Sequence, residues 1–285
     1  MTTTARPSEA APALRANDPA PRPAVLALGV GGAVICLALA GLALLNPEAL
    51  GAGVFVVQLI LVLSFLALVD APGSVGAFWV AAAAAAASDF VVLAGDGRVS
   101  GLAGVIGLGL IASLFHQLVR RGRTRVTESL ADTLVAVVLA VSASALISLR
   151  MQSGGRDAVV VCLAAGAGAL VAGRLGDQVL PRPALALGAN RGWPGLLLAL
   201  GVGAAAAVAA AGSSGPVAGA RGALLGLAIA ATVSAGDLCV DLGAAELTAG
   251  RRDARRVSAL MPAGLVLPFA ALAPVAFVAG RLVLA

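Results

Sequence analysis

The sequence predicts an all-α fold, a polytopic integral membrane protein with about nine transmembrane helices. Hydrophobic residues make up 60% of the 285 residues, only 12% are charged, and the mean hydropathy is +1.02. The apolar residues also occur in uninterrupted runs long enough to cross a bilayer. Because lipid leaves no partner for a free backbone N–H or C=O, runs of this kind are expected to be helical. These observations exclude the water-soluble classes.

The apolar runs follow one another with short polar connections between them. Gly-rich stretches inside them, such as Gly101 to Gly109, permit close contact between helices. We expect residues 24–285 to form one transmembrane helical domain. The nine predicted spans cover about residues 24–45, 50–69, 76–94, 99–119, 130–149, 157–173, 194–212, 217–241 and 260–284.

The segment before the first span has a different composition. Residues 1–23 are rich in Ala, Pro and Thr and cannot bury a hydrophobic core. The segment is too polar, and too long before the first apolar run, for a typical signal peptide. We therefore expect a disordered cytoplasmic tail.

All the basic residues are Arg, because the chain contains no Lys. Together with abundant Ala and Gly, this indicates a bias of the source genome, so the basic charge predicts no nucleic-acid partner. Connections rich in Arg stay in the cytoplasm. With an inside N-terminus, fourteen Arg fall on the inner side and five on the outer side. We therefore predict a multi-pass protein of the cell membrane with a cytoplasmic N-terminus.

Asp237 and Asp241 are the most informative polar residues, because they end a long apolar run and lie four residues apart, on one face of a helix. Ionisable groups at such depth are costly and usually face a protein interior, a cavity or a metal. Carboxylate oxygens suit Mg²⁺, and Arg side chains of the inside connections suit phosphate. The alternative interpretation is that the two residues only mark the end of the helix.

The other polar residues of the spans have simpler interpretations. His116 is expected to be an interfacial residue, and Glu128 and Asp132 fit the first turns of a helix. Asp89, near the outer end of the third span, is interpreted as a side chain that snorkels to the interface. Trp193 is expected to anchor a helix at the interface.

Four segments in order resemble the phosphatidate cytidylyltransferase (CDP-diacylglycerol synthase) family over about residues 120–285. Gly168 to Arg174 is similar to that family's Gly-Ala-Tyr-Leu-Val-Gly-Arg helix, and Gly188 to Gly195 is similar to its Ser-Pro-Lys-Lys-Thr-Trp-Glu-Gly loop. Ser234 to Leu238 resembles its Gln-x-Gly-Asp-Leu, and Ala273 to Phe277 its C-terminal Ala-Pro-Val-Ala-Tyr. The resemblance implies a membrane enzyme that joins CTP to phosphatidate with metal ions. It further implies a metal ligand at Asp237 and substrate contacts from the residues Arg174, Arg191 and Trp193. Asp241 has no counterpart in the family's motif and is added as a second metal ligand because of its spacing from Asp237.

The chain departs from this pattern where the family's chemistry is concentrated. An Asn-Asp pair of the family is replaced by Ala165 and Gly166, and Ser-Pro-Lys-Lys-Thr is reduced to the segment 188–192 with one cation. The carboxylates that enter the family's last helix have no counterpart in the segment 258–267. Two anions must be brought together in this reaction, so these losses weaken metal and triphosphate binding.

Three hypotheses follow from these residues. The first is a cytidylyltransferase-like pseudoenzyme that binds an anionic phospholipid headgroup at the cytoplasmic face. The second is an active CTP:phosphatidate cytidylyltransferase with rearranged ligands, using Asp237, Asp241, Glu246 and Arg191 with Mg²⁺. The third is a transporter or structural membrane protein, which should place polar residues on several spans.

Overall fold

The computed structural model describes residues 22–120, 125–180, 183, 191–212, 217–249 and 254–284. These residues form ten α-helices: α1 (Arg22–Leu45), α2 (Pro47–Leu68), α3 (Ser74–Ala94), α4 (Ser100–Val119), α5 (Val126–Ala143), α6 (Ala145–Met151), α7 (Gly155–Val179), α8 (Trp193–Ala211), α9 (Ala220–Ala249) and α10 (Ala254–Leu284). Within the described residues, nine segments are long and apolar enough to cross a membrane. The predicted all-α, multi-pass fold is therefore confirmed.

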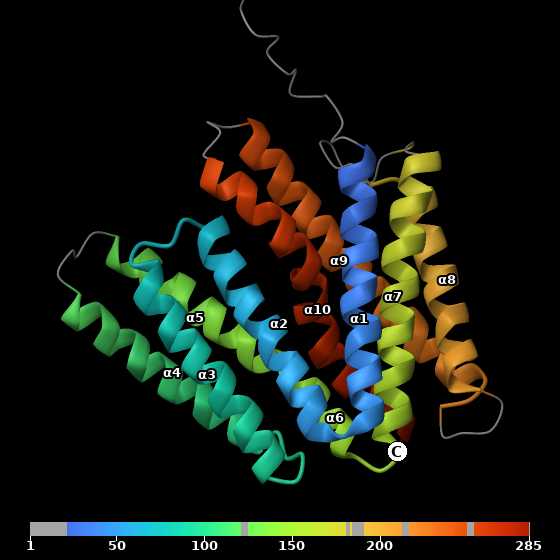
Figure 1. Ribbon diagram of the computed structural model, residues 1–285, viewed down its shortest axis with the longest axis horizontal. Coiled ribbons are helices and arrows are strands. Elements are labelled where there is room, and N and C mark those ends of the chain that lie inside the picture. The colour runs from blue at the N-terminus through green and yellow to red at the C-terminus, as the bar shows by residue number, and fades with distance from the viewer. Residues whose placement is uncertain are drawn as a thin grey trace, which may run out of the picture.

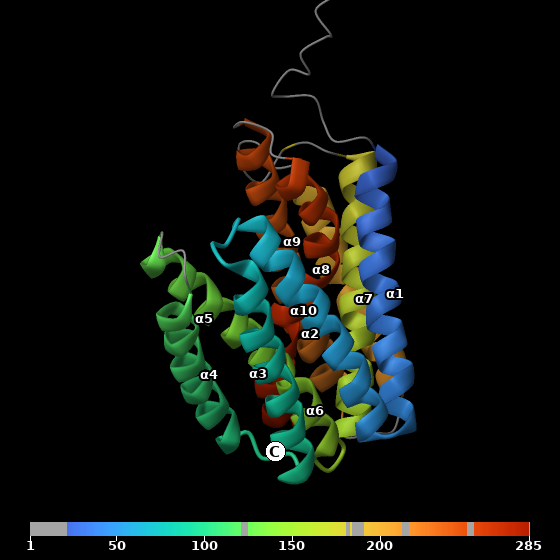
Figure 2. The same ribbon diagram turned by 60° about the vertical axis from the view of Figure 1, so that its left-hand side comes forward.

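The helices are arranged as two groups that share α2 and α10 (Figure 1). One group contains α3, α4 and α5, and the other contains α1, α7, α8 and α9. The rotated view in Figure 2 shows the same division, with α4 and α5 far from α1 and α7. Apolar residues pack inside each group, around Ala81 and Val137 in the first and around Cys162 and Leu272 in the second.

The fifth span contains a break that the sequence analysis did not predict. α5 ends at Ala143 and α6 begins at Ala145, so Ser144 separates two helices within one apolar segment. The backbone N–H of Ser144 bonds to the carbonyl of Val141, which is the tighter spacing of a 3₁₀ turn. Ser144 itself is buried, so the break lies inside the bundle.

α7 and α8 contact each other more closely than side chains larger than Gly would permit. A Cβ added at Gly176 would lie 2.8 Å from the Cα of Gly195. Such close approach is typical of helix pairs in membranes. It brings the last turns of α7 against the first turn of α8.

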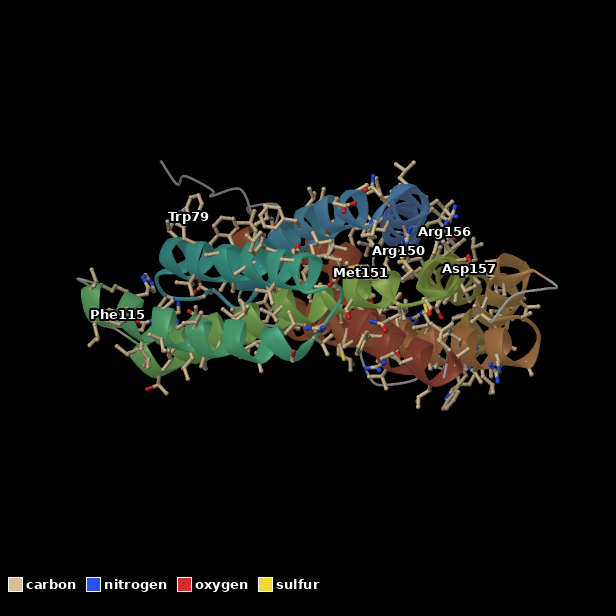
Figure 3. All side chains as sticks on the ribbon, turned by 90° about the horizontal axis from the view of Figure 1, so that it is seen from below. Trp79, Phe115, Arg150, Met151, Arg156 and Asp157 are labelled. Atoms are coloured by element: carbon tan, nitrogen blue, oxygen red, sulfur yellow. The ribbon has the colours of Figure 1, made fainter. Side chains whose placement is uncertain are left out.

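Charged residues lie near both ends of the bundle. Figure 3 shows the end formed by the α6–α7 turn, where Arg156 and Asp157 lie at the surface. Trp79 and Phe115 point outward from other helices and are exposed, as expected of side chains that face lipid. α7 then runs the length of the bundle, so Arg174 lies near the opposite end.

Residues 1–21 of the predicted tail lie outside the described residues, and the division into a tail and one domain stays a prediction.

Candidate functional site

Five charged residues meet at the end of the bundle where α7 and α9 come together. Arg174 and Asp177 are three residues apart in the last turns of α7, and Asp237 and Asp241 are four residues apart on α9. Both spacings place the pair on one helix face. Arg191 precedes α8 and completes the group, which we call the Arg–Asp cluster.

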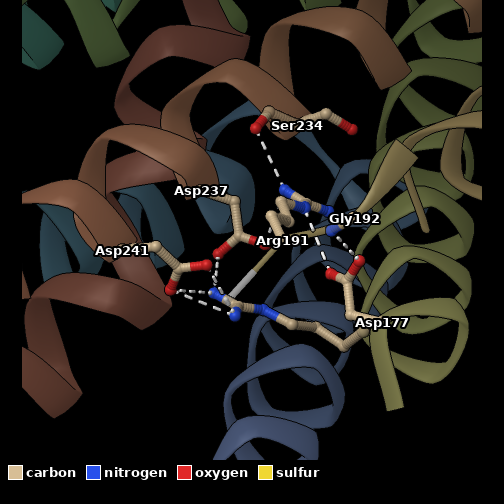
Figure 4. Close-up of polar contacts among 7 residues, drawn as sticks. Asp177, Arg191, Gly192, Ser234, Asp237 and Asp241 are labelled. Atoms are coloured by element: carbon tan, nitrogen blue, oxygen red, sulfur yellow. Dashed lines mark hydrogen bonds and ion pairs between the residues drawn. The ribbon is translucent and has the colours of Figure 1, made fainter. Parts of the chain in front are cut away.

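Figure 4 shows how the guanidinium groups are shared among the carboxylates. Arg174 donates from Nη2 to Oδ1 of Asp237, and its Nη1 lies 3.1 Å from both carboxylate oxygens of Asp241. Arg191 approaches Asp237 Oδ2 to 2.9 Å through Nη1 and Asp177 Oδ2 to 3.4 Å through Nε. Asp237 is therefore bound by both arginines.

Backbone groups complete the cluster. Arg191 Nη1 donates to the carbonyl oxygen of Ser234 at 3.0 Å, and Asp177 Oδ1 accepts from the N–H of Gly192 at 2.9 Å. The second bond is made by the residue before α8, so Asp177 fixes the position where that helix begins. The cluster thus joins α7, α9 and the segment that enters α8.

The cluster is almost completely removed from solvent and lipid except at Asp241, which is partly exposed. Arg174, Arg191 and Asp237 are each at most 1% exposed, and Asp177 is 5% exposed. Three carboxylates and two guanidiniums give a formal charge of −1. Removing each charge from water costs several kcal/mol, and the cost is offset only when opposite charges and hydrogen bonds surround it. Each carboxylate of the cluster has a guanidinium neighbour and at least one hydrogen bond, while Oδ2 of Asp177 and Oδ2 of Asp237 have the ion pair alone.

The cluster does not have the form of a divalent-cation site. Mg²⁺ requires about six oxygen ligands in octahedral geometry and usually keeps several waters. Here guanidinium groups lie against the oxygens of Asp237 and Asp241, where they would repel a divalent cation. Within the described residues, no group of three or more His, Cys, Asp or Glu could hold a metal. The residues in this arrangement do not fit Mg²⁺, and the predicted magnesium site stays a prediction.

The structure brings together four of the five residues that the sequence analysis selected. Arg174, Arg191, Asp237 and Asp241 are in contact, whereas Trp193 is 51% exposed at the start of α8. The backbone N–H of Trp193 donates to the carbonyl of Pro183 at 3.0 Å. Their predicted contacts with substrate stay predictions, and the side chain of Glu246 lies outside the described residues.

Asp177 is a member of the cluster that sequence reasoning missed. Its spacing of three residues from Arg174 was a usable signal, because it places both side chains on one face of α7. The role of Gly192 had no signal, since it depends on the backbone conformation of the chain before α8. Neither residue stands out in the sequence by its type.

Asp89 requires a correction. It was expected to snorkel to the interface, but it is buried, and its Oδ1 accepts hydrogen bonds from Gln58 and Ser144. These partners come from α2 and from the break between α5 and α6. Tertiary contacts therefore hold Asp89 inside the bundle, a result that the position of the residue in its span could not indicate.

The fold and the cluster define a class: a polytopic α-helical membrane protein with a buried, ion-paired Arg–Asp cluster at one end of the bundle. No family model, no curated protein and no solved structure matches the chain. The resemblance to the phosphatidate cytidylyltransferase family therefore depends on the sequence motifs alone.

Proposed function

We propose that this protein is a cytidylyltransferase-like pseudoenzyme of the cell membrane that binds an anionic phospholipid headgroup at its cytoplasmic end. The observation that carries the proposal is the pairing of Asp237 and Asp241 with Arg174 and Arg191. Carboxylates that neutralise buried arginines are not free to hold metal ions. Two arginines that already neutralise buried carboxylates also leave no surplus positive charge for a triphosphate, which carries several negative charges.

The absence of nucleotidyl transfer follows from the chemistry of the reaction. A phosphate oxygen of phosphatidate attacks the α-phosphorus of CTP, and pyrophosphate leaves. The charge that develops must be neutralised by metal ions or by free cationic groups. In the described residues near Asp237, the cationic groups are Arg174 and Arg191, and both already contact carboxylates.

We expect no CDP-diacylglycerol to form when the purified protein is given CTP, phosphatidate and Mg²⁺. Product is measured by mass spectrometry, with an active member of the family as the positive control and the D237N variant as the background. Product formation indistinguishable from that of D237N agrees with the proposal. Robust turnover that is lost in D237N would contradict it and favour the active enzyme.

The headgroup proposal rests on the unequal burial of the two partners of Arg174. The side chain of Asp237 is 2% exposed, whereas that of Asp241 is 9% exposed and lies at 3.1 Å from the guanidinium. Asp241 is thus the partner that an incoming anion reaches first. A phosphate monoanion that takes its place on Arg174 keeps the two-pronged geometry that guanidinium groups prefer. The net charge around Arg174 is then unchanged once Asp241 turns toward water.

Replacing Asp241 with Asn is expected to strengthen binding of phosphatidate by roughly tenfold, because it removes a negative charge that competes for Arg174. Binding is measured by titrating phosphatidate into nanodiscs of zwitterionic lipid and counting retained lipids by native mass spectrometry. D157N is the matched control, because it removes one carboxylate from the exposed opposite end of α7. Equal phosphatidate binding by D241N and D157N would contradict the headgroup proposal and leave the enzymatic result unaffected.

A further inference from the structure

A second polar cluster lies inside the other group of helices, far from the Arg–Asp cluster in the sequence and in the fold. Asp89 Oδ1 accepts from Ser144 Oγ at 2.6 Å and from Gln58 Nε2 at 3.1 Å. The hydroxyl of Ser88 lies 2.7 Å from that of Ser144, and Gln58 Nε2 also donates to the carbonyl of Ala140 at 2.9 Å. Gln58, Ser88 and Ser144 are fully buried, and Asp89 is 6% exposed.

This cluster contains a carboxyl group without a cation. The hydrogen-bond partners of Asp89 in the described residues are a neutral amide and a neutral hydroxyl, and it forms no ion pair there. The titratable side chains on the helices that pack against α3 lie in the first two or the last two turns of those helices; they are Glu48, His116, Glu128, Asp132 and Arg150. Arg150 donates to the carbonyl of Ala43. An isolated carboxylate in such a place is strongly disfavoured.

Two buried oxygen atoms of the cluster lack any partner. They are Oε1 of Gln58, which is always an acceptor, and Oδ2 of Asp89, which is an acceptor while the carboxyl group is ionised. Two acceptors cannot form a hydrogen bond with each other. A proton on Oδ2 removes the charge and converts that atom into a donor. A bound proton would therefore supply both the missing hydrogen-bond donor and the missing positive charge.

A row of polar residues continues from the cluster along one face of α6 toward the surface. Ser144, Ser148 and Gln152 are spaced four residues apart along α6 and its ends, so they share one face of the helix. The row spans about 12 Å at 1.5 Å per residue. Ser148 donates to the carbonyl of Gly97 in the α3–α4 turn, and the amide of Gln152 lies 3.4 Å from the carbonyl of Ser148.

The row ends at a cavity that is open to the outside of the bundle. Its volume is about 350 Å³, and its lining includes Asp96, Gly97, Arg98, Gln152 and Arg281. In Figure 1 this is the end where α6 lies beside the C-terminus, opposite the Arg–Asp cluster. Polar lining of this kind admits water, which supplies and accepts protons.

We propose that Asp89 is a proton-binding site within the membrane, which exchanges its proton with water in the Gln152 cavity along the polar face of α6. On binding, a proton from hydronium forms an O–H bond on Asp89 Oδ2 and releases a water molecule. On release, the proton returns to water and the carboxylate regains its charge. No electron transfer and no further reactant are involved. The site is independent of the function proposed for the Arg–Asp cluster.

The test is infrared spectroscopy of the full-length protein in nanodiscs at pH 7. The wild type is expected to show the carbonyl band of a protonated carboxylic acid, which shifts in D₂O and is absent from D89N. Replacing Ser148 with Val is expected to keep the band and to slow its shift after transfer to D₂O by roughly tenfold, because Val removes the middle hydroxyl of the proposed route. Should D89N not fold, S144A assigns the band, because loss of one hydrogen bond to the acid changes its frequency.

Three results would overturn the proposal. The first is a spectrum in which neither D89N nor S144A alters a carboxylic-acid band. The second is an exchange rate in S148V equal to that of the wild type, which contradicts the route along α6. The third is a thermal midpoint that Na⁺, compared with choline, raises in the wild type and not in D89N. That result would assign the cluster to a sodium ion.

Discussion

Replacing Arg174 with Gln is expected to lower the free energy of unfolding by about 3–5 kcal/mol, the usual cost of removing one partner from a buried ion pair. Arg174 neutralises Asp241 and shares Asp237 with Arg191. Without its guanidinium, the cluster holds three carboxylates and one cation inside the bundle. The loss is measured as the shift of the unfolding transition of the purified protein in mild detergent.

Arg156 provides the control for this experiment, because it lies on the same helix but is exposed at the opposite end of the bundle (Figure 3). Replacing Arg156 with Gln is expected to change the free energy of unfolding by no more than about 0.5 kcal/mol, as is usual for surface substitutions. Similar stabilities of R174Q and R156Q would show that the buried ion pairs contribute nothing specific.

Replacing Gly195 with Ala is expected to destabilise the protein by about 1–3 kcal/mol, because the first turn of α8 is already in van der Waals contact with α7. An added Cβ would overlap Oδ1 of Asp177 and would lie 2.8 Å from the carbonyl oxygen of Gly173. The carbonyl belongs to a helix backbone and cannot turn aside. α8 must therefore move outward, which also stretches the bond between Asp177 and Gly192.

Gly201 is the matched control on the same helix, because an added Cβ there meets nothing within 4 Å. Replacing Gly201 with Ala is expected to be neutral or slightly stabilising, as Ala favours the helix. Thermal unfolding of both variants distinguishes a packing effect from a propensity effect. A G195A protein as stable as G201A would contradict the close contact between α7 and α8.

The sequence was sufficient for the fold class because membrane helices are specified locally, by the length and composition of apolar runs. The same local information located Asp237 and Asp241, whose spacing places them on one face. It did not show that Arg174 and Arg191 would pair with them, because the two arginines lie more than 40 residues away in the chain. The predicted phosphate-binding groups and the predicted metal-binding groups are partners of each other.

Asp89 illustrates the limit of local information in the other direction. Its position within the third span is typical of a snorkelling residue, yet Gln58 and Ser144 hold it inside the bundle. The break at Ser144 that makes this contact follows from tertiary packing and has no Pro or Gly to mark it. Trp193 differs again, because the apolar run 194–212 predicted its place at the start of a helix but not the direction of its side chain.

The most direct test of the Arg–Asp cluster compares the unfolding free energy of R174Q with that of the double variant R174Q/D241N. The double variant lacks one cation and one carboxylate, so Arg191 still neutralises Asp237 and contacts Asp177 as in the wild type. If the carboxylates of α9 are present as partners of arginines, the second substitution should restore more than half of the stability lost in R174Q. A double variant no more stable than R174Q would contradict this account.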